Sequence, residues 1–276
     1  MSEVALAPRP LVPRWVNHAI TSLPWAVLGV AILAAFTPSL FTSYDPIGAA
    51  GPSLQPPGFT HWFGTDATGR DVFSRVVYGA TNSLTAAVTA VGVGLVVGSV
   101  LGLIAGSFGG LVDTLIMRGV DVLLAIPSLL LALTIIIILG FGTTQAAIAV
   151  GATSIAAFAR VMRSQVISVR ALDYVEAAYA SGGRALTVII RHILPNSLTA
   201  VGALAALHLG TAILAISTLG FLGYGAPPPT PEWGLMIAEG RDYIATAWWL
   251  TTLPGAVVVV VVLCANHIST QLGRTR

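Results

Sequence analysis

The sequence predicts an all-α integral membrane protein with six transmembrane helices and with both termini in the cytoplasm. Three observations support this prediction. First, 55% of the 276 residues are apolar and only 9% are charged, whereas about a quarter of the residues in a soluble domain carry a charge. Second, the mean hydropathy is +0.87, and uncharged stretches exceed the roughly 20 residues that cross a bilayer. Third, most arginines fall on one side of the predicted membrane.

The uncharged stretches give the spans in order. The stretch 122–159 is too long for one pass at about 1.5 Å per residue. Two glycines and three polar residues interrupt it between Gly140 and Gln145, so we expect two spans there. The predicted spans are 24–43, 81–107, 122–140, 144–162, 197–219 and 247–267, with external loops at 44–80 and 220–246 and cytoplasmic segments at 1–23, 108–121, 163–196 and 268–276.

The arginines set the predicted orientation. With a cytoplasmic N-terminus, only Arg70, Arg75 and Arg241 of the 13 basic residues lie outside, which is the asymmetry that the positive-inside rule describes. Arg9 and Arg14 before the first apolar run also fit a cleaved secretory signal. We favour a retained span because 15–44 is uncharged for longer than a usual signal core.

Residue usage excludes several classes of chemistry. All the basic residues are arginines, and without lysine the chain has neither the phosphate loop of an ATPase nor a Schiff base. Cys264 is the single cysteine, so no intrachain disulfide forms, and no Cys/His cluster has metal-ligand spacing. The net charge of +2 is too small for a nucleic-acid footprint. We therefore expect no cofactor, metal or nucleic acid on this chain, and an energy source on another subunit or in an ion gradient.

Small residues are dense in the second predicted span. Because small side chains let helix backbones approach closely in lipid, we expect this helix to pack in the interior of the bundle. The residues are Gly92, Gly94, Gly98, Ser99, Gly102, Ala105 and Gly106. At the following cytoplasmic segment, we expect Asp113, Arg118 and Asp121 to form an ion-pair network.

The predicted cytoplasmic segment 163–196 contains a motif. Small residues from Ala177 to Ser181 favour a smooth short helix, and Gly182-Gly183 can end it and turn the chain. A second helical stretch runs to His192, and we expect Pro195 to break it before the next span.

This segment carries a resemblance to a known family. It has Glu176-Ala177-Ala178, then three residues and Gly182, and then a hydrophobic stretch that ends at Pro195. This pattern resembles the EAA loop of ABC import permeases. Residues 61–75 and 221–234, with the later Trp248-Trp249, are similar to the C-type permease of dipeptide, oligopeptide and nickel importers. The similarity covers about 60–276. Thr81 departs from it, since the family commonly has arginine there, and 266–274 lacks the family's usual charged pairs.

The resemblance implies an ABC type I importer permease fold, a non-catalytic subunit in a bacterial cytoplasmic (inner) membrane and a peptide-type solute, with nickel or haem as alternatives. The implied partners are a second homologous permease, two ATP-binding cassette ATPases that hold ATP and Mg, an extracytoplasmic substrate-binding protein, and membrane lipids. The residues to which it assigns ATPase coupling are Tyr174, Glu176, Ala177, Ala178, Ser181, Gly182, Arg184, His192 and Pro195. The alternative for this segment is an amphipathic loop that binds anionic lipid headgroups.

A charged cluster in the first external loop and a histidine in the fifth span are further candidate functional residues. Asp66, Arg70, Asp71 and Arg75 fit a loop that is locked by paired hydrogen bonds, with docking of a binding protein or of peptide termini as the alternative. His208 is the only ionisable residue in the middle of the fifth span, where such a group suggests a pore-lining role, although a neutral imidazole needs only one hydrogen-bonding neighbour. His61 is expected at the surface.

The sequence is compatible with three functions to different degrees. The leading one is a permease subunit of an ATP-driven importer. The second is a secondary transporter driven by an ion gradient, but the centres of the spans contain no Asp, Glu or Arg, which ion-coupled carriers usually place near the midplane. A membrane-embedded enzyme fits least, because no nucleophile can be paired with a base.

Overall fold

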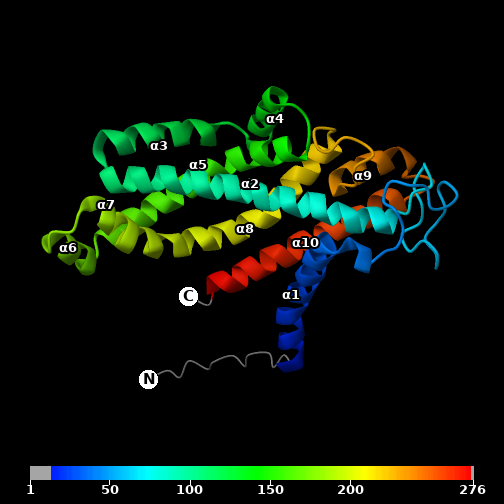
Figure 1. Ribbon diagram of the computed structural model, residues 1–276, viewed down its shortest axis with the longest axis horizontal. Coiled ribbons are helices and arrows are strands. Elements are labelled where there is room, and N and C mark those ends of the chain that lie inside the picture. The colour runs from blue at the N-terminus through cyan, green and yellow to red at the C-terminus, as the bar shows by residue number, and fades with distance from the viewer. Residues whose placement is uncertain (1–13, 275–276) are drawn as a thin grey trace, which may run out of the picture.

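The computed structural model describes the backbone of residues 14–274 and the side chains of residues 22–271. Four long helices lie roughly along one axis (Figure 1): α2 (Val72–Phe108), α5 (Thr143–Arg170), α8 (Leu194–Phe221) and α10 (Trp249–Arg274). The described residues contain no strand, only one isolated bridge between Thr65 and Asp71. The fold is therefore all-helical, as the sequence predicts.

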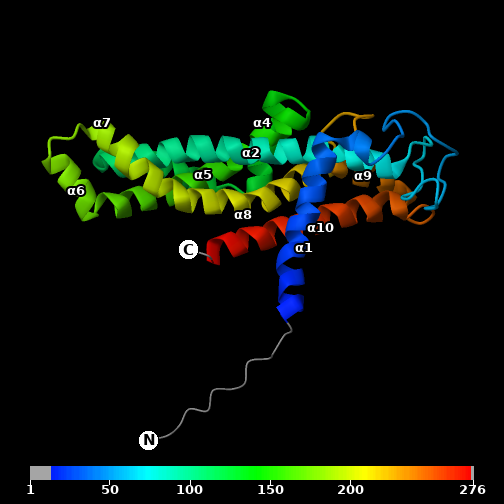
Figure 2. The ribbon, with the colours of Figure 1, turned by 60° about the horizontal axis from the view of Figure 1, so that its bottom comes forward.

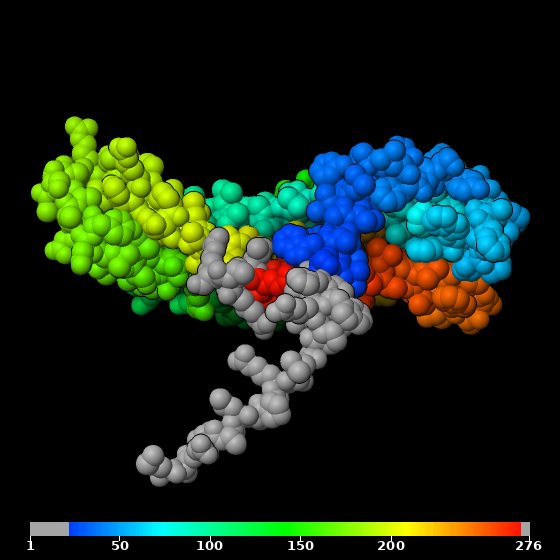
Figure 3. All heavy atoms as spheres, turned by 90° about the horizontal axis from the view of Figure 1, so that it is seen from below, coloured from blue at the N-terminus to red at the C-terminus, as the bar shows by residue number. Residues whose placement is uncertain are grey.

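Shorter elements occupy the sides and ends of this bundle. Helix α1 (Arg14–Phe36) contacts α2 and α10 and then projects away from them (Figure 2). One end holds α6 (Asp173–Ala180) and α7 (Ala185–Val188), and the other holds the 41–71 loop, α9 (Trp233–Gly240) and η3 (Arg241–Tyr243) (Figures 1 and 3). The remaining elements are η1 (Pro38–Leu40), α3 (Gly110–Ala125), α4 (Ser128–Leu139) and η2 (Ile189–Ile193).

Four helical runs in the described residues are long and apolar enough to cross a bilayer: α2, α5, Ala185–Phe221, and Trp249–Gln271 within α10. The pair α3 and α4 passes the same test only together, and it is bent by 98°. The apolar part of α1, Ser22–Phe36, is shorter. Four or five spans are thus recognisable by length and composition, and the predicted count of six stays a prediction.

The third predicted span, 122–140, differs most from the structure. Helix α3 already begins at Gly110, inside the segment 108–121 expected to be a turn, and the chain bends between Ala125 and Ser128. Pro127 causes the bend, because a proline disfavours helical backbone at the residue before it, and Ile126 is extended with φ −89° and ψ 129°. Helix α4 consequently leaves the direction of the bundle (Figure 1).

The other helices also depart from their predicted bounds. Helix α1 ends at Phe36 rather than at 43, α8 extends a few residues beyond 197–219, and α10 continues to Arg274 rather than ending at 267.

The largest extensions are those of α2 and α5. Helix α2 begins at Val72 rather than at 81, because the Asp71 side chain caps it by accepting a hydrogen bond from the Ser74 backbone N–H at 2.7 Å. Helix α5 continues to Arg170 rather than ending at 162. Uncharged stretches indicate only the part of a helix that fits in lipid, so they do not detect polar extensions at its ends.

The small residues of α2 pack against α5, as expected, but α2 as a whole is not in the interior of the bundle, since Val96 and Val100 on another face are exposed. Gly94, Gly98, Gly102 and Gly106 follow one another at four-residue spacing and are all buried. A Cβ atom on Gly98 would lie 2.5 Å from the Ile155 carbonyl oxygen. The two backbones therefore approach too closely for a side chain, as in small-residue packing of membrane helices. Gly92 is the exception, since a Cβ there meets nothing within 4 Å.

Pro195 does not break the chain before α8, contrary to the sequence prediction. The helix continues from Ala185 to Phe221 through a π-helical turn at Ile189–Ile193, in which the Leu194 N–H donates to the Ile189 carbonyl. A widened turn accommodates proline because it relieves the clash of the ring with the preceding turn. The Asn196 side-chain amide donates to the His192 carbonyl at 2.6 Å.

Candidate functional sites

The most deeply buried side chain of helix α6 is that of Val175. Val175 is fully buried and packs in a cluster with Val169 of α5, Val188 of α7 and Ile193 before α8. The sequence did not predict a role for Val175, whereas the predicted coupling residues of α6, Tyr174, Glu176, Ala177 and Ala178, are exposed or half-buried. Helix α6 thus presents an open face while Val175 holds it to three other elements. We call the stretch Asp173–Val188 the α6–α7 segment.

Two glycines end α6 in a Schellman motif. The Gly183 N–H donates to the Ala178 carbonyl at 3.1 Å, and the Gly182 N–H donates to the Tyr179 carbonyl at 3.0 Å. Gly182 has φ +83°, a conformation that favours glycine. A Cβ on Gly183 would lie 2.6 Å from the Ala178 oxygen. The exact direction of the chain between α6 and α7 therefore depends on both glycines.

The structure places the remaining predicted coupling residues around this turn. The Tyr174 and His192 rings lie 6.3 Å apart between centroids, so α6 meets the helical run that leads into α8. Ser181 donates its hydroxyl to the Ala177 carbonyl at 2.8 Å. Arg184 precedes α7 as its exposed N-cap residue, and Pro195 is exposed in the first turn of α8.

Ion pairs reinforce the same end of the bundle. The Arg163 guanidinium donates to both oxygens of Asp113 at 2.5 and 2.6 Å, and Arg160 donates to Asp121 at 2.6 Å. Arg170 donates to the Gly106 and Ser107 carbonyls, each at 2.7 Å. The prediction of a network among Asp113, Arg118 and Asp121 was wrong, because each of the two carboxylates pairs instead with a separate arginine of α5. These contacts tie α3 and the end of α2 to α5, close to the α6–α7 segment.

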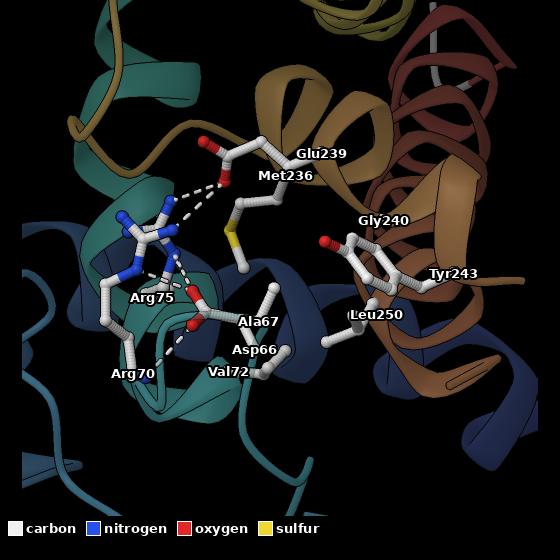
Figure 4. Close-up of a pocket in the computed structure, with 10 residues that line it drawn as sticks. All are labelled: Asp66, Ala67, Arg70, Val72, Arg75, Met236, Glu239, Gly240, Tyr243 and Leu250. Atoms are coloured by element: carbon white, nitrogen blue, oxygen red, sulfur yellow. Dashed lines mark hydrogen bonds and ion pairs between the residues drawn. The ribbon is translucent and has the colours of Figure 1, made fainter. Parts of the chain in front are cut away.

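A second cluster of charges lies at the opposite end of the bundle (Figure 4). Arg75 is 1% exposed, and its guanidinium donates to the Glu239 carboxylate at 3.0 Å and to the Pro46 and Pro229 carbonyls at 3.2 and 3.1 Å. Arg70 donates to Asp66 at 2.6 Å and lies 3.5 Å from Glu239. The network joins α2 and α9 to the 41–71 loop, which is the loop-locking geometry expected from Arg and carboxylate pairs. The cavity beside it measures only about 40 Å³.

Asp71 has a separate role beside this network. Its carboxylate accepts hydrogen bonds from the Ser74 backbone N–H and hydroxyl, both at 2.7 Å, and lies 2.8 Å from the His61 imidazole nitrogen Nδ1. His61 is 5% exposed, so the prediction of a surface histidine was wrong. Its ring is covered because it pairs with the cap of α2 and stacks on Tyr44 with centroids 5.2 Å apart.

Two glutamates at this end were not predicted to be functional from the sequence. Glu239 completes the arginine network, and Glu232 is 1% exposed as the N-cap of α9, accepting from the Gly234 and Leu235 N–H groups at 2.9 and 2.8 Å. Burial raises the pKa of Glu232 above its usual value, although these hydrogen bonds oppose the rise. Glutamate is not among the residue types preferred as N-caps, so the capping role of Glu232 has no strong local signal. The partnership of Glu239 with Arg75 spans 164 residues and has no local signal either.

Two other notable positions have clear contacts. The Thr81 hydroxyl donates to the Ala35 carbonyl at 2.7 Å, so the residue that departs from the family pattern ties α2 to α1. His208 lies half-buried in α8, and its ring is 5.0 Å from that of Phe158 between centroids.

The charge state of Asp66 predicts a pH dependence. Burial raises the pKa of Asp66, but hydrogen bonds from Thr68 and Arg70, together with the charge of Arg70, outweigh it and hold the pKa below its usual value. The ionised carboxylate therefore stabilises the fold above the pKa of the unfolded chain, about 3.9, and this stabilisation is lost as the pH falls through the lower folded-state pKa.

We expect Asp66→Asn to lower the melting temperature at pH 7, and we expect this difference to shrink at pH values below about 4. Asp45→Asn is the control, because Asp45 is exposed and bonds only locally, to the Ile47 N–H. Thermal unfolding of the purified chain in detergent measures both. A difference for Asp66→Asn that is as large at pH 3 as at pH 7 would contradict the assignment.

Comparisons with known proteins add independent findings. Residues 98–275 match the family model described as binding-protein-dependent transport system inner membrane component. The dipeptide transport system permease protein of Alkalihalophilus pseudofirmus is 44% identical over 241 residues, which cover 87% of this chain and 79% of that protein. The glutathione transport system permease protein of Escherichia coli is 41% identical over 262 residues, which cover 93% and 84%.

One solved structure has a similar fold. A chain of the MetNI methionine ABC transporter, in inward-facing conformations, aligns with a TM-score of 0.58 over 73% of this chain and 95% of that chain. The sequence identity is 18%, so the match supports the fold alone. It agrees with the importer permease architecture that the sequence predicts.

Proposed function

The chain belongs to the family of binding-protein-dependent transport system inner membrane components and is a multi-pass permease subunit of an ABC importer, and we propose that it moves short peptides. Its relatives are named for dipeptide and glutathione transport, and both solutes are small molecules with amide bonds. We propose further that a soluble binding protein delivers the solute and that a second, homologous permease supplies the other half of the pathway. Two ATPase subunits then hold ATP and Mg.

The α6–α7 segment is the observation that carries the coupling role. Helix α6 exposes Tyr174, Glu176 and Ala177, while buried Val175 fixes it to α5 and to the run that leads into α8. A force applied to α6 is therefore transmitted to two membrane-spanning helices rather than absorbed by a loose loop. When two ATPase subunits close on nucleotide, they would move the α6 helices as rigid bodies. Because α6 is fixed to the membrane-spanning helices, this motion would switch the permease between its inward-facing and outward-facing states.

The orientation follows from this role. ATPases act in the cytoplasm, so we propose that the α6–α7 segment and both termini lie there, and that the 41–71 loop with α9 lies outside. The ion-pair network of Asp66, Arg70 and Arg75 then keeps the external end rigid for a docking binding protein. A secondary transporter, the alternative function from the sequence, does not fit a family of binding-protein-dependent permeases.

Reversing the charge of Glu176 tests the proposal. We expect Glu176→Lys to reduce the amount of ATPase that co-purifies with the chain at least tenfold, because a lysine would replace an exposed carboxylate on the open face of α6. Co-expression with the ATPases and the second permease, followed by quantification of each subunit, measures the effect. Both the unmodified chain and the Glu176→Lys variant must remain in the membrane fraction.

Asp242→Lys is the matched control. Asp242 is also an exposed acidic residue, but it belongs to η3, at the end of the bundle that holds the 41–71 loop. We expect it to retain the ATPases fully. Equal retention in both variants would place the ATPase contact elsewhere, and no retention by the unmodified chain would refute the importer function.

A further inference from the structure

A groove lined partly by polar side chains lies between α5 and α8, in the middle of otherwise apolar helices. Two cavities of about 290 and 270 Å³ share Ser128, Val150, Thr153 and Ala215, so they form one continuous space. We call it the α5–α8 groove. Its polar lining consists of Ser128, Thr153, Ser154, His208, Thr211 and Thr218.

Helix periodicity directs these side chains to the same space. On α8, His208, Thr211, Ala215 and Thr218 are spaced by three or four residues and so share one face. On α5, Val150, Thr153, Ser154 and Ala157 do the same. The bend at Pro127 adds Ser128, because α4 begins beside the groove instead of continuing the line of α3. Three separate helices thus contribute polar groups to one place.

The groove differs from the surfaces suited to lipid. The exposed residues of α2 and α10 include Val96, Val100, Val259 and Leu263, which are side chains that hydrocarbon accepts. Polar and ionisable groups inside a membrane instead face other protein or a water-filled space. His208 and Thr153 are only half-buried, and Thr211 is exposed, so they are expected to face such a space in the assembled transporter.

The hydrogen bonds of the hydroxyl groups define what the groove can bind. Thr153 donates to the Val150 carbonyl at 2.7 Å, and Thr211 donates to the His208 carbonyl at 2.9 Å. Ser154 and Thr218 also donate to carbonyls of their own helices, each at 2.8 Å. Since each hydroxyl has one proton and two lone pairs, the Thr153, Thr211 and Thr218 oxygens keep the capacity to accept a hydrogen bond. The Ser154 oxygen instead lies against Gly94 of α2.

Charge is missing from the same lining. No Asp, Glu or Arg lines either cavity among the described residues, and His208 is the only ionisable group there. An uncharged row of acceptors binds N–H groups, but weakly enough that a solute can leave again, which conduction requires.

We propose that the α5–α8 groove is this chain's share of the solute pathway, and that its hydroxyl acceptors select solutes rich in N–H donors. The backbone amides and the ammonium group of a short peptide have this chemistry. Thr153 and Thr211 are the specificity-determining residues, and His208 lies beside them at the same face of α8. The inference rests on the proposed importer function and adds the surface and the chemistry by which the permease contacts its solute.

The first test measures whether water reaches the groove, by labelling cysteines introduced at single positions. The method is practical because Cys264 is the only native cysteine. In a Cys264→Ser background, Thr153→Cys and Thr211→Cys are compared with Thr89→Cys. Thr89 is also an exposed threonine that donates to its own helix, to the Thr85 carbonyl at 2.8 Å, but it does not line the groove.

The complete transporter in lipid vesicles is treated with a charged, membrane-impermeant methanethiosulfonate reagent, with and without ATP. We expect positions 153 and 211 to react at least tenfold faster than position 89 in one of the two states. Saturating peptide, delivered by its binding protein, should slow this reaction. Equal rates at all three positions would show that the groove is closed to water, and they would overturn the proposal.

Removing the hydroxyls provides the second test. Thr153→Val and Thr211→Val keep the shape of the side chain and remove the acceptor, so each should lower peptide transport per ATP hydrolysed about fivefold. Thr89→Val should leave it unchanged. Normal ATPase retention with unaltered transport in the groove variants would refute the groove alone. Loss of ATPase from the unmodified chain would instead refute the importer function on which it rests.

Discussion

Replacing Gly98 by leucine is expected to destabilise the bundle strongly. Gly98 lies where α2 crosses α5, and an added Cβ atom would already be 2.5 Å from the Ile155 carbonyl oxygen and 2.6 Å from the Phe158 Cβ. The obstacles are backbone and the first atoms of a side chain, neither of which can rotate away. Because overpacking of a tight core typically costs 1 to 3 kcal/mol, we expect about 3 kcal/mol or more here.

Gly92→Leu is the matched control for this prediction. It introduces the same side chain into the same helix, but a Cβ on Gly92 meets nothing within 4 Å. The yield of monodisperse protein after detergent extraction, together with its melting temperature, measures both variants. If Gly98→Leu is as stable as Gly92→Leu, then α2 and α5 do not pack through the glycine stripe.

Arg75→Met is expected to lower the stability of the 41–71 loop and its packing against α2 and α9. Arg75 is 1% exposed and satisfies Glu239 and two loop carbonyls at once. Methionine fills a similar length but donates nothing, so a carboxylate and two carbonyl oxygens lose a charged donor. Removing one partner of a buried ion pair costs about 3 to 5 kcal/mol. We expect the lower end, because the Glu239 side chain is 32% exposed.

Arg241→Met serves as the control. Arg241 also faces a carboxylate, that of Asp242 at 3.3 Å, but both side chains are well exposed, and such pairs contribute little to stability. Thermal unfolding and limited proteolysis of the 41–71 loop measure the two variants. An unchanged melting temperature and protease resistance for Arg75→Met would mean that the loop is held by other contacts.

Much of the bundle could be predicted from the sequence because lipid imposes a simple rule. Long uncharged stretches located the helices that now appear as α2, α5, α8 and α10, and the close spacing of Gly94, Gly98 and Gly102 predicted a buried helix face. Both signals are local. They depend on bilayer thickness and on backbone approach, which operate in the same way in any membrane protein.

The elements that differed depend on backbone geometry at single residues. Pro127 bends the chain by 98° between α3 and α4, whereas Pro195 is absorbed by a π turn and leaves the helix continuous. The same residue type thus has opposite effects. Which effect occurs depends on whether neighbouring turns can widen, and hydropathy contains no information on that point.

The candidate sites also include features that local sequence predicts and features that it does not. The turn at Gly182 follows from local sequence, and its φ of +83° shows why glycine is needed. The partnership of Arg75 with Glu239 and the groove between α5 and α8 join residues far apart in the chain. For the groove a partial signal exists, since the spacing of His208, Thr211 and Thr218 forms a polar stripe along one helix.

Solute uptake by the purified assembly tests the central claim most directly. The chain, a second permease and the two ATPases are placed in vesicles, and a labelled dipeptide is supplied with its binding protein. The proposed function predicts accumulation that requires ATP and the binding protein and that is lost in the Glu176→Lys assembly. Accumulation by this chain alone, driven by a proton or sodium gradient without ATP, would contradict it.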